Sequence, residues 1–486
     1  MTPIQPHIEF LTYDLISRIL DEAFQLMQKP GIKMQSPEAI KILVNAGATS
    51  DGDVVKIPEK IVRKALDTTP SEFYLYDRQG NRKVHYGGNS VHFDPGSSGV
   101  HILDPETLEH RASYSADLLR VVKVTEMLKQ YDAQSTAIVC NEIPKAIGDL
   151  YRLYIVLLFS QKPVVTGSFS LQTIDPMFEM LSIFTGNRQG LAEKPQAVFD
   201  VCPSPPLIWS DFGAGNLIAL ARAMVPAELI SMPLAGAAAP VTLIGSVVQH
   251  AAESLSGIAI HQLAGPGAPI VWGGAPAIFD MRHGTTPMGA IETAMIDAAY
   301  AQVGKSLNLP THAYLGASDA KVVDAQAGME SSLSALVGAL AGINMISGAG
   351  MLDFLACQSP EKLVIDAEGI AMVQRLLAGI GTPTEILATA LLEGINFKGD
   401  FLKQKITREL FQKEQNLPSA VIDRESIRGW QAAGGKDTFS RAKIRTRELI
   451  EAYIRPSYAP EQENALHKMV KKLAEKAGLN ELPKLE

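Results

Sequence analysis

The densest group of polar side chains in this chain lies between residues 314 and 330. Gln326 and Glu330 are four residues apart in helix-like sequence, so they share one helical face. Ser318 and Lys321 fall in the loop before that helix, and such a loop can face an active site. We predict Glu330, Gln326 and Lys321 as catalytic residues. The alternative is structural: an aspartate caps the helix and the charged side chains point to solvent.

The elements that must position these residues repeat along the chain. Between residues 90 and 350, short β-branched or small apolar segments run into Gly, Pro, Ser, Cys, Asn or Asp, and helix-like sequence follows each. Their starts lie roughly 30 to 42 residues apart, enough for one strand, one helix and two loops. We predict an α/β fold, a (β/α)8 TIM barrel, with its site at the carboxyl ends of the strands. The predicted strands are 91–94, 133–141, 164–168, 197–203, 227–233, 270–274, 312–318 and 343–347.

Helical sequence flanks this pattern on both sides. Apolar residues recur at helical spacing in 11–27 and 37–46, and 54–57 is typical of a short strand. Beyond residue 360 the pattern is helical again and then becomes charged. We predict an N-terminal helical segment (1–85), a catalytic barrel domain (86–380) and a C-terminal helical region (381–486).

The composition argues against several classes of protein. A net charge of -8 disfavours a nucleic-acid partner, and no uninterrupted apolar run reaches the length of a membrane span. The N-terminus has no secretory signal pattern, and three cysteines are too few and too scattered for a disulfide framework. We therefore expect a cytoplasmic protein that contacts neither membrane nor nucleic acid.

Two stretches resemble a known family. Residues 316–330, which begin Gly-Ala-Ser-Asp-Ala-Lys, closely resemble the seventh-strand region of the trimethylamine methyltransferase family. Asp-Arg-Glu-Ser-Ile-Arg-Gly-Trp at 423–430, continuing through Gly434 and Gly435 to Ala442, is a second match. Length, barrel pattern and flanking helices fit as well. The resemblance implies an enzyme that transfers methyl groups from methylated amines to the corrinoid (cobalamin) of a separate corrinoid protein, with no cofactor bound tightly by the barrel itself.

The resemblance also bears on the substrate. One branch of the family uses pyrrolysine at the barrel mouth to bind and activate trimethylamine, whereas Lys321 and its neighbours occupy the corresponding region here. Members without pyrrolysine demethylate quaternary amines such as glycine betaine, proline betaine and carnitine. We predict a glycine betaine methyltransferase of this branch. Trimethylamine or another betaine is the alternative substrate.

The chemistry of a quaternary amine defines the pocket that we expect. Its nitrogen has a fixed charge, so a Co(I) nucleophile can displace a neutral tertiary amine without a general acid, and the barrel supplies position and electrostatics. Aromatic faces attract such a cation, a carboxylate can neutralise it, and hydrogen-bond donors can hold the carboxylate of a betaine. Packing in the core is the alternative role for each ring. The predicted substrate-binding residues are His92, Phe93, Asp94, Asn141, Phe169, Trp209, Tyr314, Ser318 and Phe354.

Two other hypotheses about the function of the chain stay open. Cys140, Cys202 and Cys357 lie at or just after strand ends, so a zinc-dependent thiol methyltransferase is conceivable, although scattered cysteines are more often core residues and we predict no metal site. A barrel that only binds an amine or a corrinoid partner is a further alternative. For the methyl transfer that we predict, the corrinoid protein docks over the carboxyl ends of the strands, and a homo-oligomer is compatible with the sequence.

Overall fold

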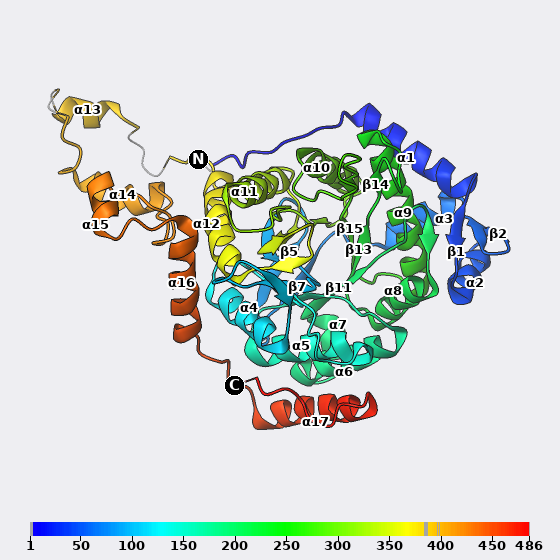
Figure 1. Ribbon diagram of the computed structural model, residues 1–486. Coiled ribbons are helices and arrows are strands. Elements are labelled where there is room, and N and C mark those ends of the chain that lie inside the picture. Colours follow the sequence, from blue (N-terminus) through cyan, green and yellow to red (C-terminus); the bar gives the residue numbers. More distant parts are fainter. Residues whose placement is uncertain (1–2, 383–386, 396, 398, 486) are drawn as a thin grey trace.

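Parallel strands form a closed barrel in the computed structural model, which describes residues 3–382, 387–395, 397 and 399–485 (Figure 1). Five strands pair in the order β15-β13-β11-β10-β9 and three in the order β17-β18-β6. A bridge from Trp272 to Thr311 and the Asp132 N–H to Phe93 C=O hydrogen bond close the two remaining gaps. The predicted (β/α)8 fold is confirmed, with every predicted segment overlapping a strand. The strands are β6 (His92–Pro95), β9 (Gln134–Ser135), β10 (Val164–Thr166), β11 (Ala197–Val201), β13 (Ala227–Ser231), β15 (Ile270–Gly274), β17 (His312–Ala313) and β18 (Met345–Ala349).

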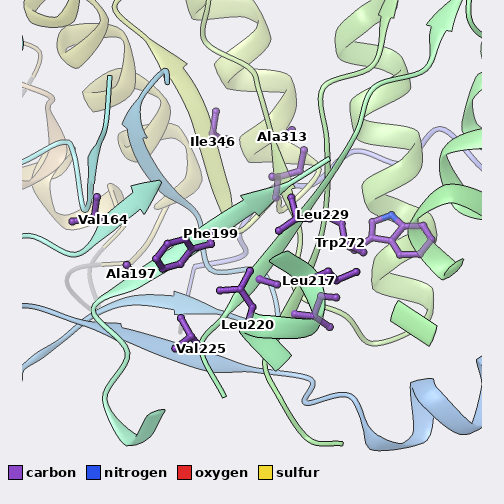
Figure 2. Close-up of a cluster of buried hydrophobic side chains, with 14 of the residues drawn as sticks. Val164, Ala197, Phe199, Leu217, Leu220, Val225, Leu229, Trp272, Ala313 and Ile346 are labelled. Atoms are coloured by element: carbon purple, nitrogen blue, oxygen red, sulfur yellow. The ribbon is translucent and has the colours of Figure 1, made fainter. Parts of the chain in front are cut away.

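Helices surround the barrel because the outward faces of the strands are apolar. Phe199, Leu229 and Trp272 point away from the barrel axis and pack with Leu217 and Leu220 of α8 in the buried core (Figure 2). Each fully buried side chain of this size contributes about 1.5–3 kcal/mol to stability. The surrounding helices are α4 (Ser115–Met127), α5 (Gly148–Phe159), α6 (Leu171–Thr185), α8 (Asp211–Ala223), α9 (Leu243–Ala264), α10 (Ile291–Ser306), α11 (Ala325–Leu340) and α12 (Pro360–Leu377).

A β-hairpin closes the amino end of the barrel. Strands β4 (Phe73–Tyr76) and β5 (Arg82–Tyr86) are antiparallel, and the Phe73 and Tyr86 rings stack with centroids 4.8 Å apart. Hairpin side chains pack against inward-facing residues near the starts of the barrel strands, so this end is filled rather than open. The resulting apolar layer, which we call the amino-end layer, consists of Leu75, Val84, Tyr86, Ala133, Val165, Val198, Val271 and Met345, all 0% exposed.

The flanking segments pack on the outside of the barrel. The N-terminal helix α1 and helix α3 lie on α9, and β1 pairs in parallel with the short strand β12, which follows β11. The strand predicted at 54–57 is confirmed as β3. None of the helices in the described ranges combines the length and apolar character needed to span a bilayer. The elements are α1 (Tyr13–Gln28), β1 (Ile32–Met34), α2 (Pro37–Asn45), β2 (Thr49–Asp51), β3 (Val54–Lys56), α3 (Glu59–Thr68) and β12 (Ile208–Trp209).

The C-terminal helices lie outside the barrel, with α13, α14 and α15 standing away from it and α16 and α17 packed on its outer helices (Figure 1). Helix α16 packs on α12 and α4, and α17 packs on α5 and α6. The division into three parts stays a prediction, and its first boundary, between residues 85 and 86, falls inside β5. The helices are α13 (Thr389–Ile395), α14 (Lys405–Glu414), α15 (Ile427–Ala432), α16 (Thr438–Ala452) and α17 (Pro460–Lys476).

Candidate active site

We infer open space at the mouth of the barrel, at the carboxyl ends of its strands, from the side chains of β11. Val198 belongs to the amino-end layer, so the alternation along β11 turns Asp200 and then Cys202 inward as well. Cys202 is nevertheless solvent-exposed, although burial among surrounding atoms raises its pKa to about 12. An inward side chain can be exposed only if space opens above it. Rim elements around this space are β7 (His101–Leu103), β8 (His110–Ala112), β14 (Leu234–Ala235), β16 (Ala277–Ile278), β19 (Met351–Leu352) and β20 (Cys357–Gln358).

Two acidic residues from adjacent strands lie at the floor of this hollow. The Tyr314 hydroxyl donates a hydrogen bond of 2.8 Å to Oδ2 of Asp200, and the Tyr86 hydroxyl donates one of 3.2 Å to Oε1 of Glu228. Burial raises the pKa of Asp200 to about 7. Burial also raises the pKa of Glu228 well above its usual range, and the neighbouring charge of Asp200 raises it further. Glu228 therefore favours its protonated form, and the pair gains a single negative charge on Asp200 as pH rises through about 7.

A third carboxyl group is connected to the same centre. The Ser347 hydroxyl donates to Oδ1 of Asp94 at 2.5 Å, and Nε2 of His312 lies 3.0 Å from that hydroxyl and 4.0 Å from Oε2 of Glu228. Burial lowers the pKa of His312 to about 3, so the ring is neutral, and burial raises the pKa of Asp94 well above its usual range. Asp94 Oδ2, Asp200 Oδ1 and Glu228 Oε2 are buried with no hydrogen-bond partner among the described residues. A proton between Asp200 and Glu228 can satisfy the oxygens of that pair, since the two side chains are close enough for a hydrogen bond. Asp94 Oδ2 remains, and an unsatisfied buried oxygen is uncommon in native proteins and points to a ligand or water.

Glu330 ties the rim loops together. Its Oε2 accepts hydrogen bonds from the Ser318 hydroxyl at 2.6 Å and the Asp319 N–H at 2.8 Å, and its Oε1 accepts one from Gln326 Nε2 at 2.8 Å. Asp319 in turn accepts from two backbone N–H groups of the loop after β16. A side chain at Gly289 of that loop would place its Cβ 2.5 Å from Oε2 of Glu330. Glu330, Gln326 and Ser318 thus come together, and their contacts hold the loops that follow β16 and β17.

Lys321 lies on the rim with its side chain 54% exposed. Its Nζ donates to the Asp319 C=O at 2.6 Å, lies 3.0 Å from Oδ1 of Asp353 and stands 3.8 Å from the centroid of the Phe354 ring. Asp353, Phe354 and Leu355 all adopt positive φ, between 50° and 68°. Consecutive residues other than glycine in this region store strain, which is typical of functional loops. Lys321 and Phe354 therefore meet, at the outer edge of the mouth.

Two more predicted residues lie at the mouth. The Phe169 ring is 53% exposed, its backbone N–H donates to Asp149 at 2.7 Å, and the Arg152 guanidinium carbon lies 4.6 Å from its centroid. Asn141 is exposed on the rim, where its Nδ2 donates to the Ser113 C=O at 3.0 Å. Phe169 is thus available to a ligand, whereas Asn141 mainly links rim segments.

Three predicted residues lie away from the mouth. His92 begins β6 at the amino end, where Nε2 accepts from the His85 N–H, because the first residue of a strand lies opposite the mouth. Phe93 points outward and packs beneath α11 and α12. Trp209 is fully buried on β12, and its indole N–H donates to the Ser256 hydroxyl at 2.9 Å. The core role left open for Phe93 and Trp209 matches these contacts.

The sequence analysis missed Asp200, Glu228 and Arg152. Asp200 and Glu228 each stand inside a short apolar strand, and Arg152 interrupts the apolar run of α5, where it is 1% exposed. An ionisable residue inside an apolar segment is rarely buried without a partner. That signal was present in the sequence and could have identified all three residues.

The three cysteines are protonated thiols in this structure. Burial raises the pKa of Cys140, Cys202 and Cys357 to about 12 each. Across the described ranges, no group of three or more His, Cys, Asp or Glu side chains is arranged to hold a metal ion.

A parallel barrel with ionisable residues gathered at its carboxyl end defines a (β/α)8-barrel enzyme. The chain belongs to the trimethylamine methyltransferase family, whose model, described as Trimethylamine methyltransferase (MTTB), matches residues 1–478, and it is a methyltransferase. It is 32% identical over 460 residues to trimethylamine methyltransferase MttB of Methanosarcina thermophila, covering 91% of this chain and 93% of the relative. It is 27% identical over 480 residues to glycine betaine methyltransferase of Desulfitobacterium hafniense, covering 98% and 100%.

The fold is similar to that of a solved relative. The crystal structure of the monomethylamine methyltransferase of Methanosarcina barkeri superimposes with a TM-score of 0.51 and covers 93% of this chain and 90% of that chain. The sequence identity is 13%, so this likeness bears on the fold alone.

Proposed function

We propose that this chain transfers one methyl group from a quaternary amine to the Co(I) corrinoid of a separate protein. Glycine betaine is the substrate that we propose. The observation that carries the proposal is the pair of carboxyl groups, Asp200 and Glu228, that lie side by side at the floor of the mouth, each with a hydrogen bond from a tyrosine hydroxyl. A fixed cation above this floor gains an electrostatic partner and needs no proton from it. The family match and the glycine betaine methyltransferase relative support the same class of substrate.

The residues of the mouth fit the needs of this reaction. The C–N bond of the quaternary amine breaks with its electron pair on nitrogen, so the product is a neutral tertiary amine, and the methyl cation equivalent goes to Co(I), which supplies both electrons of the new bond. Asp200 binds the starting cation, and the hydrogen bond from Tyr314 fixes the direction of its carboxylate. The exposed Phe169 ring offers a face to the methyl groups.

The role that we propose for the rim is positioning. Glu330 and Gln326 hold the loops after β16 and β17 in place, and Lys321 with Phe354 borders the entrance. Exposed apolar side chains that follow the barrel strands offer a partner an apolar face on this side of the molecule. They include Val100, Phe169, Phe212, Met232, Met281 and Met329.

The test is a methyl-transfer assay with purified protein and free cob(I)alamin. Glycine betaine, proline betaine, carnitine and trimethylamine are supplied one at a time, and methylcobalamin is followed by absorbance while the demethylated amine is identified by mass. We expect methylcobalamin and dimethylglycine with glycine betaine. Amine binding without methylcobalamin would favour the non-enzymatic alternative.

Trimethylamine is the second candidate substrate, because relatives named trimethylamine methyltransferase are 30–32% identical to this chain. It differs from the betaines by lacking both the fixed charge and the carboxylate. If trimethylamine is the one compound of the panel that is demethylated, then trimethylamine, and not a quaternary amine, is the substrate. A zinc content near one per chain together with a thiol acceptor would favour the third alternative.

A further inference from the structure

Arg152 is a buried cation that forms no ion pair within the described part of the chain. The residue lies on α5 and is 1% exposed. Its Nη1 donates to the Ser98 hydroxyl at 3.2 Å and to the Thr136 C=O at 3.0 Å, whereas Nη2 is buried with no partner among the described residues. The nearby Asp149 is bonded to the Phe169 N–H and the Thr173 hydroxyl instead. A buried charge is normally paired, because removal from water costs several kcal/mol.

The contacts of Arg152 place it beside the hollow. Its guanidinium lies over the half-exposed ring of Phe169. Ser98, which adopts a left-handed φ of 62°, places its hydroxyl 3.2 Å from that of Ser97. The Ser97 side chain is also near the Tyr314 hydroxyl, which donates to Asp200. Polar side chains therefore lie across the mouth between Asp200 at one end and Arg152 at the other.

We infer that Arg152, with the Ser98 hydroxyl, binds the carboxylate of a zwitterionic substrate whose quaternary nitrogen faces Asp200. This inference rests on the proposed function and narrows the substrate to amines that carry a carboxylate. Guanidinium is suited to the role because its planar donors match the two oxygens of a carboxylate. The bound carboxylate supplies the partner that Nη2 lacks. It also neutralises the charge of the guanidinium. Burial makes that charge unfavourable in the unliganded protein and lowers the pKa of Arg152.

Calorimetric binding to the full-length protein separates this role from a structural one. The probes are glycine betaine, proline betaine, carnitine and tetramethylammonium, which has the quaternary nitrogen without a carboxylate. In Arg152→Gln we expect the Kd of the best-binding zwitterion to rise about 10- to 100-fold, with that of tetramethylammonium changed less than about threefold. Arg152→Lys restores part of the loss. Arg120→Gln, at a partly exposed ion pair with Glu361, is the matched control and leaves both Kd values unchanged.

Three outcomes would overturn the inference. They are equal losses for both classes of ligand, an unchanged Kd for the zwitterion, or a wild-type protein that binds none of the carboxylated amines. If Arg152→Gln fails to fold by circular dichroism, Ser98→Ala provides the second variant, with the same selective loss expected at smaller size. Zwitterion binding that depends on Arg152 but yields no methylcobalamin would refute the proposed function and leave this inference standing.

Discussion

The two ends of the same barrel differ in the polarity of their side chains. At the amino end, the hairpin β4–β5 completes an apolar layer in which every member is fully buried. At the mouth, three carboxyl groups and a guanidinium are buried with unsatisfied atoms, and an inward cysteine reaches solvent. The amino end gains stability from burial, whereas the mouth gives up stability to keep charges out of water. The difference shows where this fold can bind a charged ligand and where it cannot.

The largest effect is expected from Asp200→Asn. Removing the carboxylate at the floor of the mouth leaves the substrate cation without its partner, so methyl transfer to cob(I)alamin should fall roughly 100-fold or more. Asp132→Asn, which changes an aspartate near His92 at the amino end, is the matched control and should keep most activity. Equal losses in the two variants would remove the functional distinction between the ends.

At the amino end, Met345→Ala should affect stability instead. Met345 is fully buried in the amino-end layer, and truncating a buried Met costs about 2–5 kcal/mol because a cavity remains. We expect a lower Tm in thermal unfolding, with methyl transfer per folded molecule within about twofold of wild type. A large loss of activity at an unchanged Tm would contradict this assignment.

The pH dependence should have opposite signs for binding and for stability. Burial raises the pKa of Asp200 to about 7, so the carboxylate forms as pH rises through 7 and the Kd of the amine at pH 6 should be roughly tenfold higher than at pH 8. The folded-state pKa lies above the unfolded value of 3.8, so the stability that the protonated group gives the apo protein is full below about pH 4 and is lost as pH rises from there through 7. Calorimetry between pH 6 and 8 measures the binding, and thermal unfolding between pH 4 and 8 measures the stability. Asp200→Asn should flatten both profiles.

Glu330→Gln should have a moderate effect. The substitution weakens the charge-assisted hydrogen bonds from Ser318 and the Asp319 N–H, so the loops at the mouth lose part of their support. We expect kcat/KM to fall about 3- to 10-fold with the fold intact. A loss as large as that of Asp200→Asn would instead assign Glu330 direct contact with the reacting amine.

The smallest effect is expected from Lys321→Met. Lys321 was predicted as catalytic, but an exposed ion pair with Asp353 contributes about 0–1 kcal/mol, so methyl transfer should change less than about threefold. Steady-state kinetics with the best substrate measures this. A loss above about 100-fold would support the catalytic role.

The fold could be predicted because strand patterning is local. Each barrel strand has its own apolar residues and turn signals, and the order of strands follows the chain. The site depends on facts that are not local. Trp209 follows a barrel strand closely in sequence, yet its strand β12 pairs with β1 from the N-terminal segment, which turns the ring into the core. Asp200 faces inward because the alternation of β11 starts from Val198 of the amino-end layer, and Glu228 faces the same way because it pairs with Asp200 in register.

The hydrogen bond from Tyr86 to Glu228 limits how this protein can be dissected. The phenol belongs to the hairpin that seals one end, and the acid belongs to the pair that sets the charge at the other. A truncated enzyme that lacks the hairpin would lose this donor along with the seal, and its acid pair would titrate differently even if the remaining strands assembled. Minimal versions made for engineering should therefore keep residues 73–86.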